Sequence, residues 1–528
     1  MFVTAPAAPH WRAFTLLVAV ATATAAGCRG EGGVVPGAAR DRLIFAAAAD
    51  ATTLDPHNTT DTESDQVIMM VYEPLIAFDD QMKIGPRLAE RWSVADDGVT
   101  WTFHLRSGVR FHDGTPFDAE AVRLNFARVL DPVANHKRLS LFSMIDRVEV
   151  VDPLTVRFVT KYPFGAFEPT IAHVSSAIVS PAVAAAHGKA FGSSAPAVSG
   201  TGPYRVAGWK KDQEIVLERF DGYWGTKGVT REIVYRPIPE AAARVLALES
   251  GDVDVISRIP ATDIPRLESR SDVAVYKLPG VGAQQFRFNV SRKPYDDPRV
   301  RQAISYAIDR QAIVRNLVSS FARPSTSALT PIMRGYVNLG EIPYDPDKAR
   351  ALLAAAGYPK GFATKIATTP RYPMGVELAE AVAADLKKVG ITAAIEVFDW
   401  ATMVQFWAGL PPEKNPQEIF IMGAGASTAD ADWGLRPIFR SAPTNENNYG
   451  YYSNAEFDRV IEAAMRETDA AKRQALYTRA QQIVYLEDPG AVWLFDTLYS
   501  VAARKAVSGV RPLPLGVVTF ERAAVAAS

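Results

Sequence analysis

Apolar and polar side chains alternate strictly from position 99 to position 106. The apolar members are Val99, Trp101, Phe103 and Leu105, and the polar members between them are Thr100, Thr102, His104 and Arg106. A period of two predicts a strand with one buried side and one side that faces water. The preceding Asp97-Gly98 pair is typical of a hairpin turn. Further strands are predicted over 42–49, 147–160 and 214–219, so the first half of the chain is β-rich.

The second half follows a helical period instead. Apolar residues recur at Ala349, Leu352, Leu353 and Ala356, which predicts a helix that begins after Asp345-Pro346 and ends at Gly357. Asp297-Pro298 predicts a similar helix start. A strand over 363–368, a helix and a strand over 391–398 then follow one another, which predicts a parallel pair with a right-handed crossover. We therefore expect two α/β lobes with a ligand cleft between them.

The N-terminus reads as an export signal. Residues 14–27 (FTLLVAVATATAAG) are uncharged and apolar or small, and this run is shorter than a membrane span of about 20 residues. Such a run is typical of a secretory signal. Ala25-Ala26-Gly27-Cys28 looks like a bacterial lipobox, although Ala25 stands where leucine is preferred. We expect lipidation at Cys28 and a flexible tether over 29–41. The protein would then be periplasmic or at the cell surface, anchored to the membrane by lipid. The alternative is ordinary signal-peptidase cleavage near Cys28.

Charge and composition disfavour several classes of function. The 528 residues include 57 basic and 58 acidic ones, with a net charge of -1, whereas nucleic-acid binders carry a basic excess. Cys28 is the single cysteine, which leaves no intramolecular disulfide and no cysteine metal site. No H-E-x-x-H, G-x-S-x-G or P-loop motif occurs. We expect no cofactor, no metal, no nucleic-acid partner and no catalytic site. Sugar-cleaving carboxylate pairs meet only on folding, so an enzyme remains the least favoured alternative.

Four segments resemble one known family. They are LAERWSVADDGVTWTFHLRSGVRFHDGTP at 88–116, GTGPY at 200–204 with Tyr223-Trp224 after it, NVSRKPYDDPRVRQAISYAIDR at 289–310 and YDPDKARALLAAAGYP at 344–359. Together they resemble solute-binding protein family 5, the peptide/nickel-binding group of bacterial ABC importers, over about residues 42–525. Within that family, GAGASTADADWGLRPIF at 423–439 is most similar to glutathione- and dipeptide-binding members.

The resemblance implies an α/β fold of the type II periplasmic binding proteins, with two hinged lobes and an extra subdomain in the first lobe (cluster C-like). The expected division is 42–74, 201–283 and 491–528 for lobe I, 75–200 for the extra subdomain and 284–490 for lobe II. The implied function is capture of a dipeptide, oligopeptide or glutathione by a monomer, and delivery to ABC permease subunits with their ATPases. The alternatives are a nickel chelate, haem or an oligosaccharide as ligand, and a sensor or chaperone role. For a nickel chelate, His57 is the histidine to consider.

The resemblance also implies the ligand-binding residues. They are Asp430, Asp432, Ser427, Trp433, Arg371, Trp400 and Gln284. Ser427 stands where many peptide-binding members hold the ligand's amine with an aspartate, and Asp430 and Asp432 follow it. Asp430 either anchors the amine or caps a helix, and Trp433 either stacks on the ligand or fills the core.

Arg371 is the candidate for the carboxylate of a peptide, because its planar fork matches that group. The other interpretation of Arg371 is a solvated surface residue. Trp400 and Gln284 belong to segments that the resemblance places at the cleft, whereas Tyr72 and Glu73 are interpreted as structural.

Overall fold

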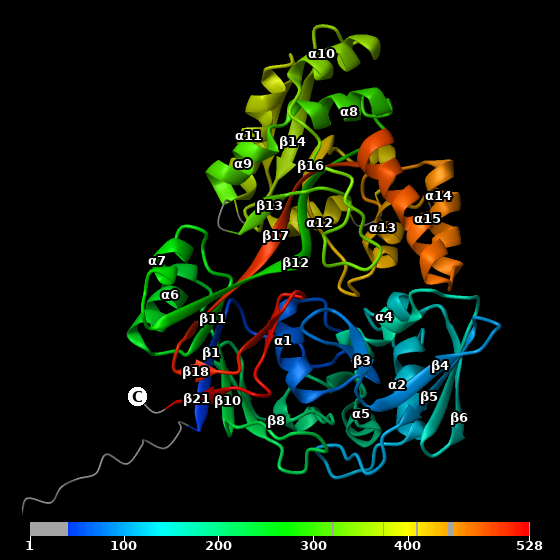
Figure 1. The fold of residues 1–528 in the computed structure, drawn as a ribbon, viewed down its shortest axis with the longest axis vertical. Coiled ribbons are helices and arrows are strands. Elements are labelled where there is room, and N and C mark those ends of the chain that lie inside the picture. Colours follow the sequence, from blue (N-terminus) through cyan, green and yellow to red (C-terminus); the bar gives the residue numbers. More distant parts are fainter. Residues whose placement is uncertain (1–40, 319–320, 373, 408–409, 442–446, 527–528) are drawn as a thin grey trace, which may run out of the picture.

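The computed structural model describes residues 41–526 except 319–320, 373, 408–409 and 442–446. Cys28, the export signal and the tether lie outside the described residues, and so do the predictions made for them. Figure 1 shows a lower part that is mostly blue and cyan, an upper part that is green, yellow and orange, and two long strands that join them. None of the helices in the described ranges is long and apolar enough to cross a bilayer.

One sheet of eleven strands extends through both parts. Its order is β15-β14-β16-β12-β17-β11-β1-β10-β9-β8, with β13 paired to β17. The bounds are β15 Thr392–Val397, β14 Ala363–Thr368, β16 Ile419–Gly425, β12 Val273–Phe288, β17 Ala491–Arg504, β11 Val255–Ser257, β1 Arg42–Ala47, β10 Glu232–Pro237, β9 Glu214–Arg219, β8 Tyr204–Lys210 and β13 Ala322–Pro324. The strands predicted at 42–49, 214–219, 363–368 and 391–398 are confirmed.

The antiparallel strands β12 and β17 connect the lower and upper parts of the molecule (Figure 1). The lower end of β17 pairs with β11, and the upper end of β12 pairs with β16. The register between them breaks from Pro279 to Ala283, in a stretch that contains Gly280 and Gly282. Irregular pairing of this kind bends a strand locally, so this break is the natural hinge between the lobes.

The upper part, lobe II, has the predicted strand-helix-strand unit. Strands β14 and β15 are parallel, and α11 connects them. The helices of this lobe are α8 Pro298–Ala307, α9 Arg310–Ile313, α10 Pro346–Ala355, α11 Gly375–Lys387, α12 Trp400–Trp407, α13 Ala431–Phe439, α14 Ala455–Arg466 and α15 Ala470–Gln482, with short turns η4 Val314–Val318, η5 Pro412–Lys414 and η6 Ile483–Glu487. The caps predicted at Asp297 and Asp345 are confirmed, because each carboxylate accepts a first-turn N–H.

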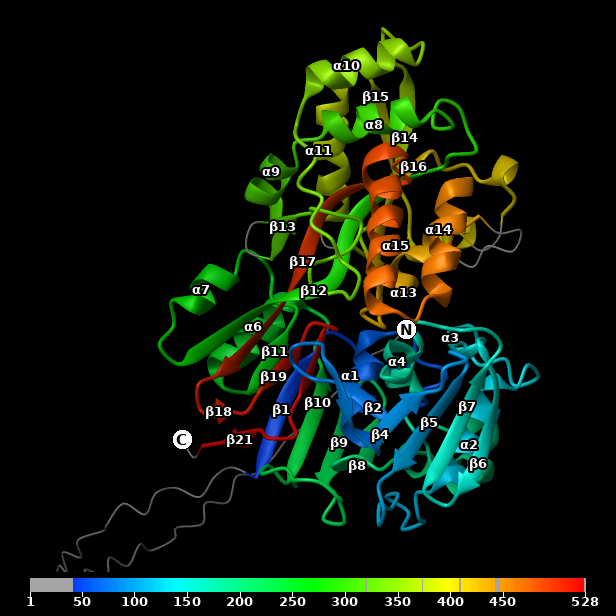
Figure 2. The ribbon, with the colours of Figure 1, turned by 45° about the vertical axis from the view of Figure 1, so that its right-hand side comes forward.

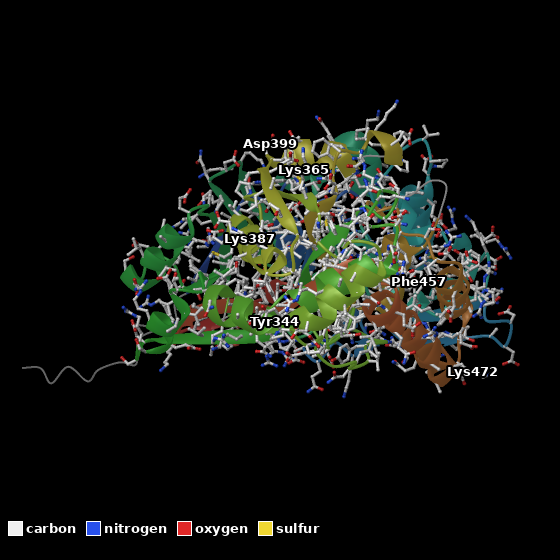
Figure 3. All side chains as sticks on the ribbon, turned by 90° about the horizontal axis from the view of Figure 1, so that it is seen from above. Tyr344, Lys365, Lys387, Asp399, Phe457 and Lys472 are labelled. Atoms are coloured by element: carbon white, nitrogen blue, oxygen red, sulfur yellow. The ribbon has the colours of Figure 1, made fainter. Side chains whose placement is uncertain are left out.

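Lobe II has two packing units. Seen from its far end, Lys365, Lys387 and Asp399 of the β14–β15 region lie on one side, and Phe457 and Lys472 of the α14–α15 hairpin lie on the other (Figure 3). Each unit has its own core, one around Leu378 and Val382 of α11 and one around Phe457 and Tyr477.

The lower part, lobe I, carries the remaining elements of the large sheet and small strand pairs. Its helices are α1 Thr62–Val71, α6 Ala241–Ser250 and α7 Ile264–Glu268. Its small pairs are β18 Val507–Ser508 with β21 Ala524–Val525, β19 Arg511–Leu513 with β20 Val517–Thr519, and β2 Ile76–Phe78 with β3 Ile84–Pro86.

A four-stranded antiparallel sheet, in the order β4-β5-β7-β6, stands beside lobe I (Figure 2). Its strands are β4 Ala89–Val94, β5 Thr100–Leu105, β7 Thr155–Thr160 and β6 Ile145–Asp152. The helices around it are α2 Ala119–Leu130, α3 Leu139–Phe142, α4 Phe167–Ile171 and α5 Pro181–His187, with short turns η1 Val174–Ser176, η2 Gly188–Ala190 and η3 Ala195–Ala197. Trp101, Phe103 and Leu105 are buried, which confirms the alternation. Leu124 of α2 is 39% exposed.

A buried carboxylate joins this subdomain to lobe I. Glu73 is 1% exposed and accepts hydrogen bonds from Thr201 Oγ1, Tyr223 OH and Trp224 Nε1, each at 2.8 Å. Arg87 Nε approaches the same carboxylate at 2.7 Å. A buried charge that is paired and fully hydrogen-bonded fixes its surroundings, so the structural interpretation of Glu73 is confirmed.

Candidate ligand-binding site

Lobe II touches the subdomain of lobe I along one side, where α13 lies above α4 in both views (Figures 1 and 2). The backbone N–H of Gly165 donates to the carbonyl of Met465 at 2.9 Å, and the Arg466 guanidinium lies 4.9 Å from the centre of the Tyr162 ring. Between the two parts lies a cavity of about 620 Å³. It is lined from below by Trp92, Trp101 and Glu168, and from above by Arg334, Arg473 and Tyr477.

Asp430 and Asp432 open helix α13 at this junction. Asp430 is 0% exposed, caps the helix by accepting from Asp432 N at 2.9 Å, and receives Arg473 at 2.7 and 3.0 Å. Asp432 receives Arg436 at 2.8 and 2.7 Å. The capping interpretation of Asp430 is therefore confirmed. Both carboxylates are engaged by arginines of the protein itself, and a direct ligand role for either stays a prediction.

Trp433 packs between the two parts of the molecule. Its half-buried ring contacts the apolar core of the subdomain and the core around α14 and α15 in lobe II. Trp433 therefore packs against core residues, as one of its two interpretations held, and this packing connects lobe II with the subdomain.

Three other predicted residues follow the ends of three neighbouring strands. Arg371 comes three residues after β14, Trp400 three after β15 and Ser427 two after β16. Strand β14 is parallel to both β15 and β16, so the carboxyl ends of the three strands lie at one edge of the sheet. In open α/β sheets, ligands bind outside that edge.

Arg371 and Trp400 touch each other at this edge. The Arg371 guanidinium lies 4.7 Å from the centre of the Trp400 ring, a geometry that favours a cation over an aromatic face. Tyr372 packs edge-on against Trp400, with ring centres 5.9 Å apart. A Cβ at position 423, where Gly423 stands, would lie 3.1 Å from Tyr372 Cε1, which is a tight contact. Among the described residues, no carboxylate lies within 4.0 Å of Arg371, whose side chain is exposed.

Gln284 occupies a neighbouring position, but its amide is already used. It lies opposite Gly423 in the β12–β16 pairing, is buried, and donates from Nε2 to Met422 O at 3.1 Å. The structure therefore brings Arg371, Trp400, Ser427 and Gln284 to one region, and places Asp430, Asp432 and Trp433 at the junction with the subdomain.

The comparisons with known proteins identify the family. Residues 83–446 match the description "Bacterial extracellular solute-binding proteins, family 5 Middle". The chain is 34% identical over 490 residues to the glutathione-binding protein GsiB of Escherichia coli K12 and to that of Shigella dysenteriae, covering 92% of this chain and 94% of each relative.

The chain belongs to solute-binding protein family 5. A solved structure of the periplasmic binding protein DppA from Helicobacter pylori, in complex with the peptide STSA, has a TM-score of 0.79 and 29% identity, and covers 92% of this chain and 98% of that one. The binding protein CtaP of Listeria monocytogenes, at 23% identity, has a TM-score of 0.83 over 92% of this chain and 100% of that one, which shows the shared fold. The predicted type II periplasmic binding protein fold is confirmed.

His57 does not face the region of Arg371 in this family 5 protein. It is fully buried in lobe I, where its ring contacts the Arg128 guanidinium and burial lowers its pKa to about 3. Among the described residues, no group of three histidine, cysteine or acidic side chains is placed to hold a metal ion.

The sequence reasoning overlooked one buried acid of the hinge strands. Asp496 of β17 lies opposite Ala283 of β12, is 7% exposed and accepts a hydrogen bond from Ser325 Oγ at 2.8 Å. Burial raises its pKa to about 7, although the hydrogen bond from Ser325 acts in the opposite direction. The available signal was a single carboxylate inside the apolar run AVWLFDTLYSV.

Proposed function

We propose that this family 5 protein captures a small peptide-like solute between its lobes and delivers it to the permease of an ABC importer, with glutathione as the first ligand to test. The observation that carries the proposal is the 34% identity, over nearly the whole chain, to proteins named for binding glutathione. The likeness to a DppA that holds the peptide STSA supports the same class of ligand.

The edge formed by β14, β15 and β16 supports a carboxylate-bearing ligand. Arg371 presents a planar guanidinium without an acidic partner among the described side chains, and Trp400 fixes its plane. A carboxylate accepts two parallel hydrogen bonds from such a group. Closure about the irregular stretch of β12 would then bring lobe I over the bound solute, the mode known for periplasmic binding proteins.

We extend the proposal to the whole chain. We propose the division expected from the sequence, with 42–74, 201–283 and 491–528 as lobe I, 75–200 as the subdomain and 284–490 as lobe II, and with the strands β12 and β17 shared at the hinge. A lipid on Cys28 would hold the exported monomer at the membrane beside its permease and ATPases. Its role is solute capture without catalysis.

A second candidate ligand class is a carboxylated solute that is not a peptide. A solved structure of the binding protein AgaA from A. tumefaciens holds agropinic acid, at 28% identity and a TM-score of 0.77, covering 92% of this chain and 99% of that one. The same arginine edge suits either class, because the recognised group is the carboxylate in both.

The test is a thermal-shift and calorimetric screen of residues 29–528 against glutathione, dipeptides, longer peptides, agropinic acid, nickel with histidine, and haem. A ligand present at 1,000 times its Kd stabilises a protein by about 4 kcal/mol. We expect glutathione or a peptide to bind, and Arg371→Ala to weaken that binding by about 10- to 100-fold, since hydrogen bonds to charged groups contribute about 1.5–3 kcal/mol.

The matched control is Arg459→Ala, which removes an exposed arginine on the outer helix α14. It should leave the affinity unchanged. Binding of agropinic acid, a nickel chelate or haem without any peptide would overturn the peptide assignment and keep the fold. Equal affinity of the Arg371→Ala variant would remove that arginine from the site.

A further inference from the structure

Lobe I contains a second cavity, separate from the arginine edge of lobe II. Its volume is about 700 Å³, within the range of about 300–1,000 Å³ that small-molecule sites occupy. Its walls come from the turn at 55–58, from α2 and the loop after it, and from the α5–η2 segment. All of these elements precede the hinge strand β12, so the cavity does not depend on how the lobes close.

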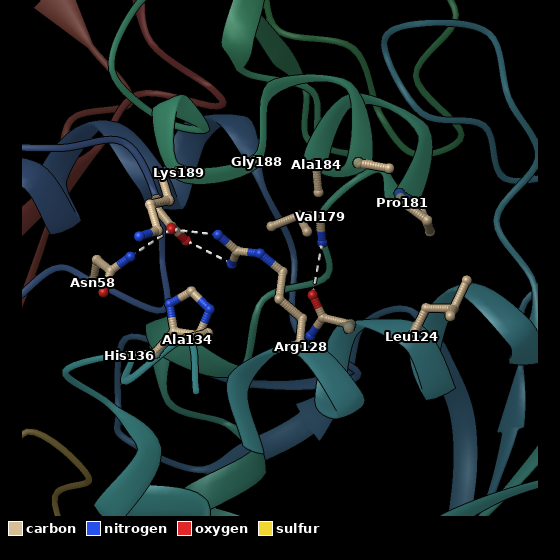
Figure 4. Close-up of a pocket in the computed structure, with 13 residues that line it drawn as sticks. Asn58, Leu124, Arg128, Ala134, His136, Val179, Pro181, Ala184, Gly188 and Lys189 are labelled. Atoms are coloured by element: carbon tan, nitrogen blue, oxygen red, sulfur yellow. Dashed lines mark hydrogen bonds and ion pairs between the residues drawn. The ribbon is translucent and has the colours of Figure 1, made fainter. Parts of the chain in front are cut away.

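The two ends of this cavity differ in chemistry (Figure 4). Polar side chains gather at one end, namely Asn58, Arg128, His136 and Lys189. Aliphatic side chains form the other, namely Leu124, Val179, Pro181 and Ala184, with Ala185 beside them. The exposed Leu124 of helix α2 belongs to this apolar wall, which gives a reason for an exposed leucine at that position.

The charged side chains that line the polar end are Asp55, Arg128 and Lys189. Arg128 and Asp55 neutralise each other through two hydrogen bonds, at 3.0 and 2.6 Å. Burial lowers the pKa of His57 to about 3 and also lowers the pKa of His136, so both rings are neutral at pH 7. The charge that remains among the lining residues is that of Lys189, which is exposed; the carboxylate of Asp131, just after α2, acts on His136 from outside the lining.

Two buried nitrogen atoms in the wall of this cavity have no partner among the described residues, one on Asn125 beside Val179 and one on His136 at the polar end. Asn125 accepts the Val179 N–H through its Oδ1 at 3.1 Å, but its own Nδ2 donates to no atom of the described residues. His136 Nδ1 also lacks a partner there. Both residues line the cavity and are at least nine-tenths buried. An unsatisfied buried polar atom destabilises the fold, so a ligand oxygen that accepts from such an atom would remove this cost.

The geometry points to a binding site for a small amphipathic carboxylate, whose oxygens lie beside Lys189 and His136 and whose aliphatic chain lies along α5. This site is distinct from the peptide site proposed above, and neither depends on the other. An aliphatic chain matches the apolar wall because the burial of CH₂ groups against apolar side chains is favourable.

The probe is sodium octanoate, below the concentration at which it forms micelles, titrated by calorimetry into residues 29–528. Octylammonium, with the same chain and the opposite charge, is measured in parallel. We expect octanoate to bind at least tenfold more tightly than octylammonium. Lys189→Ala should weaken octanoate several-fold, whereas Lys227→Ala, another exposed lysine outside the cavity, should have no effect.

The occupied volume is tested with tryptophan scanning along α5. Ala185→Trp places an indole into the cavity from an exposed position, and Ala182→Trp places one on the same helix at an exposed position outside the lining. The first variant should abolish octanoate binding and the second should retain it, with both variants unfolding at the same temperature within error.

Glutathione or peptide binding should be equal in both tryptophan variants, which separates failure of this inference from failure of the proposed function. The inference is overturned if octanoate does not bind the unaltered protein, if its binding survives Ala185→Trp, or if octylammonium binds as tightly as octanoate.

Discussion

Replacement of Asp496 by asparagine tests whether a buried charge of the hinge strands destabilises the fold. The side chain is 7% exposed, and Ser325 Oγ donates a hydrogen bond to it at 2.8 Å. Asparagine has almost the same shape and keeps an oxygen that accepts from Ser325. The variant therefore removes the titrating group with little change in packing.

The sign and size of the effect follow from the raised pKa. The carboxyl group has a pKa of about 7 in the folded protein, against a model-peptide value of 3.8. A difference of about 3 units corresponds to about 4 kcal/mol. Because the folded pKa is the higher one, the wild-type protein has its full stability below pH 4 with respect to this group, and loses stability as the pH rises toward 7. Asp496→Asn escapes this loss.

Urea unfolding at pH 4.5 and at pH 8 measures the difference between the two proteins. We expect near-equal free energies of unfolding at pH 4.5 and a variant that is more stable by up to about 4 kcal/mol at pH 8. Asp65, whose pKa burial raises to about 6, is present in both proteins and cancels. Asp80→Asn, at an exposed site, should show no such trend. A difference that stays constant between the two pH values would refute the reasoning.

Two further substitutions test the junction between the lobes. A Cβ at Gly165 would overlap the carbonyl oxygen of Glu467, so Gly165→Ala should prevent the contact between lobe II and the subdomain and weaken ligand binding at least tenfold by calorimetry. The control Gly85→Ala, with open space around it, should leave the affinity unchanged. Equal affinities of the two variants would show that closure does not need this contact. Asp430→Asn leaves the Arg473 guanidinium buried without its charge partner and should lower the free energy of unfolding by about 3–5 kcal/mol; a loss of ligand affinity at unchanged stability would instead favour the amine-anchor role.

The local features of the fold are predictable from the sequence because short-range chemistry decides them. Asp297 and Asp345 accept hydrogen bonds from backbone N–H groups two or three residues later, and the alternation before Arg106 sets which side of β5 is buried. The buried face of α2 is different. Leu124 has the same apolar character as Val122 and Phe126, yet it faces a cavity and the others face the core. The helical period already places Leu124 on another side of α2 than Val122 and Phe126; that this side faces a cavity shared with α5 depends on residues some sixty positions along the chain.

The residues of the candidate site also differ in how far the sequence could predict them. Arg371, Trp400 and Ser427 were predicted from the family resemblance, and the structure places each of them just after a strand that ends at the same edge of the sheet. The partner of Asp430 was not, since Arg473 lies 43 residues away on another helix. The sequence around an aspartate that precedes a helix is the same whether the aspartate binds a ligand's amine or pairs with an arginine of the protein. What distinguishes the two cases is the presence of a second charge, and that charge is placed only by the packing of α15 against α13.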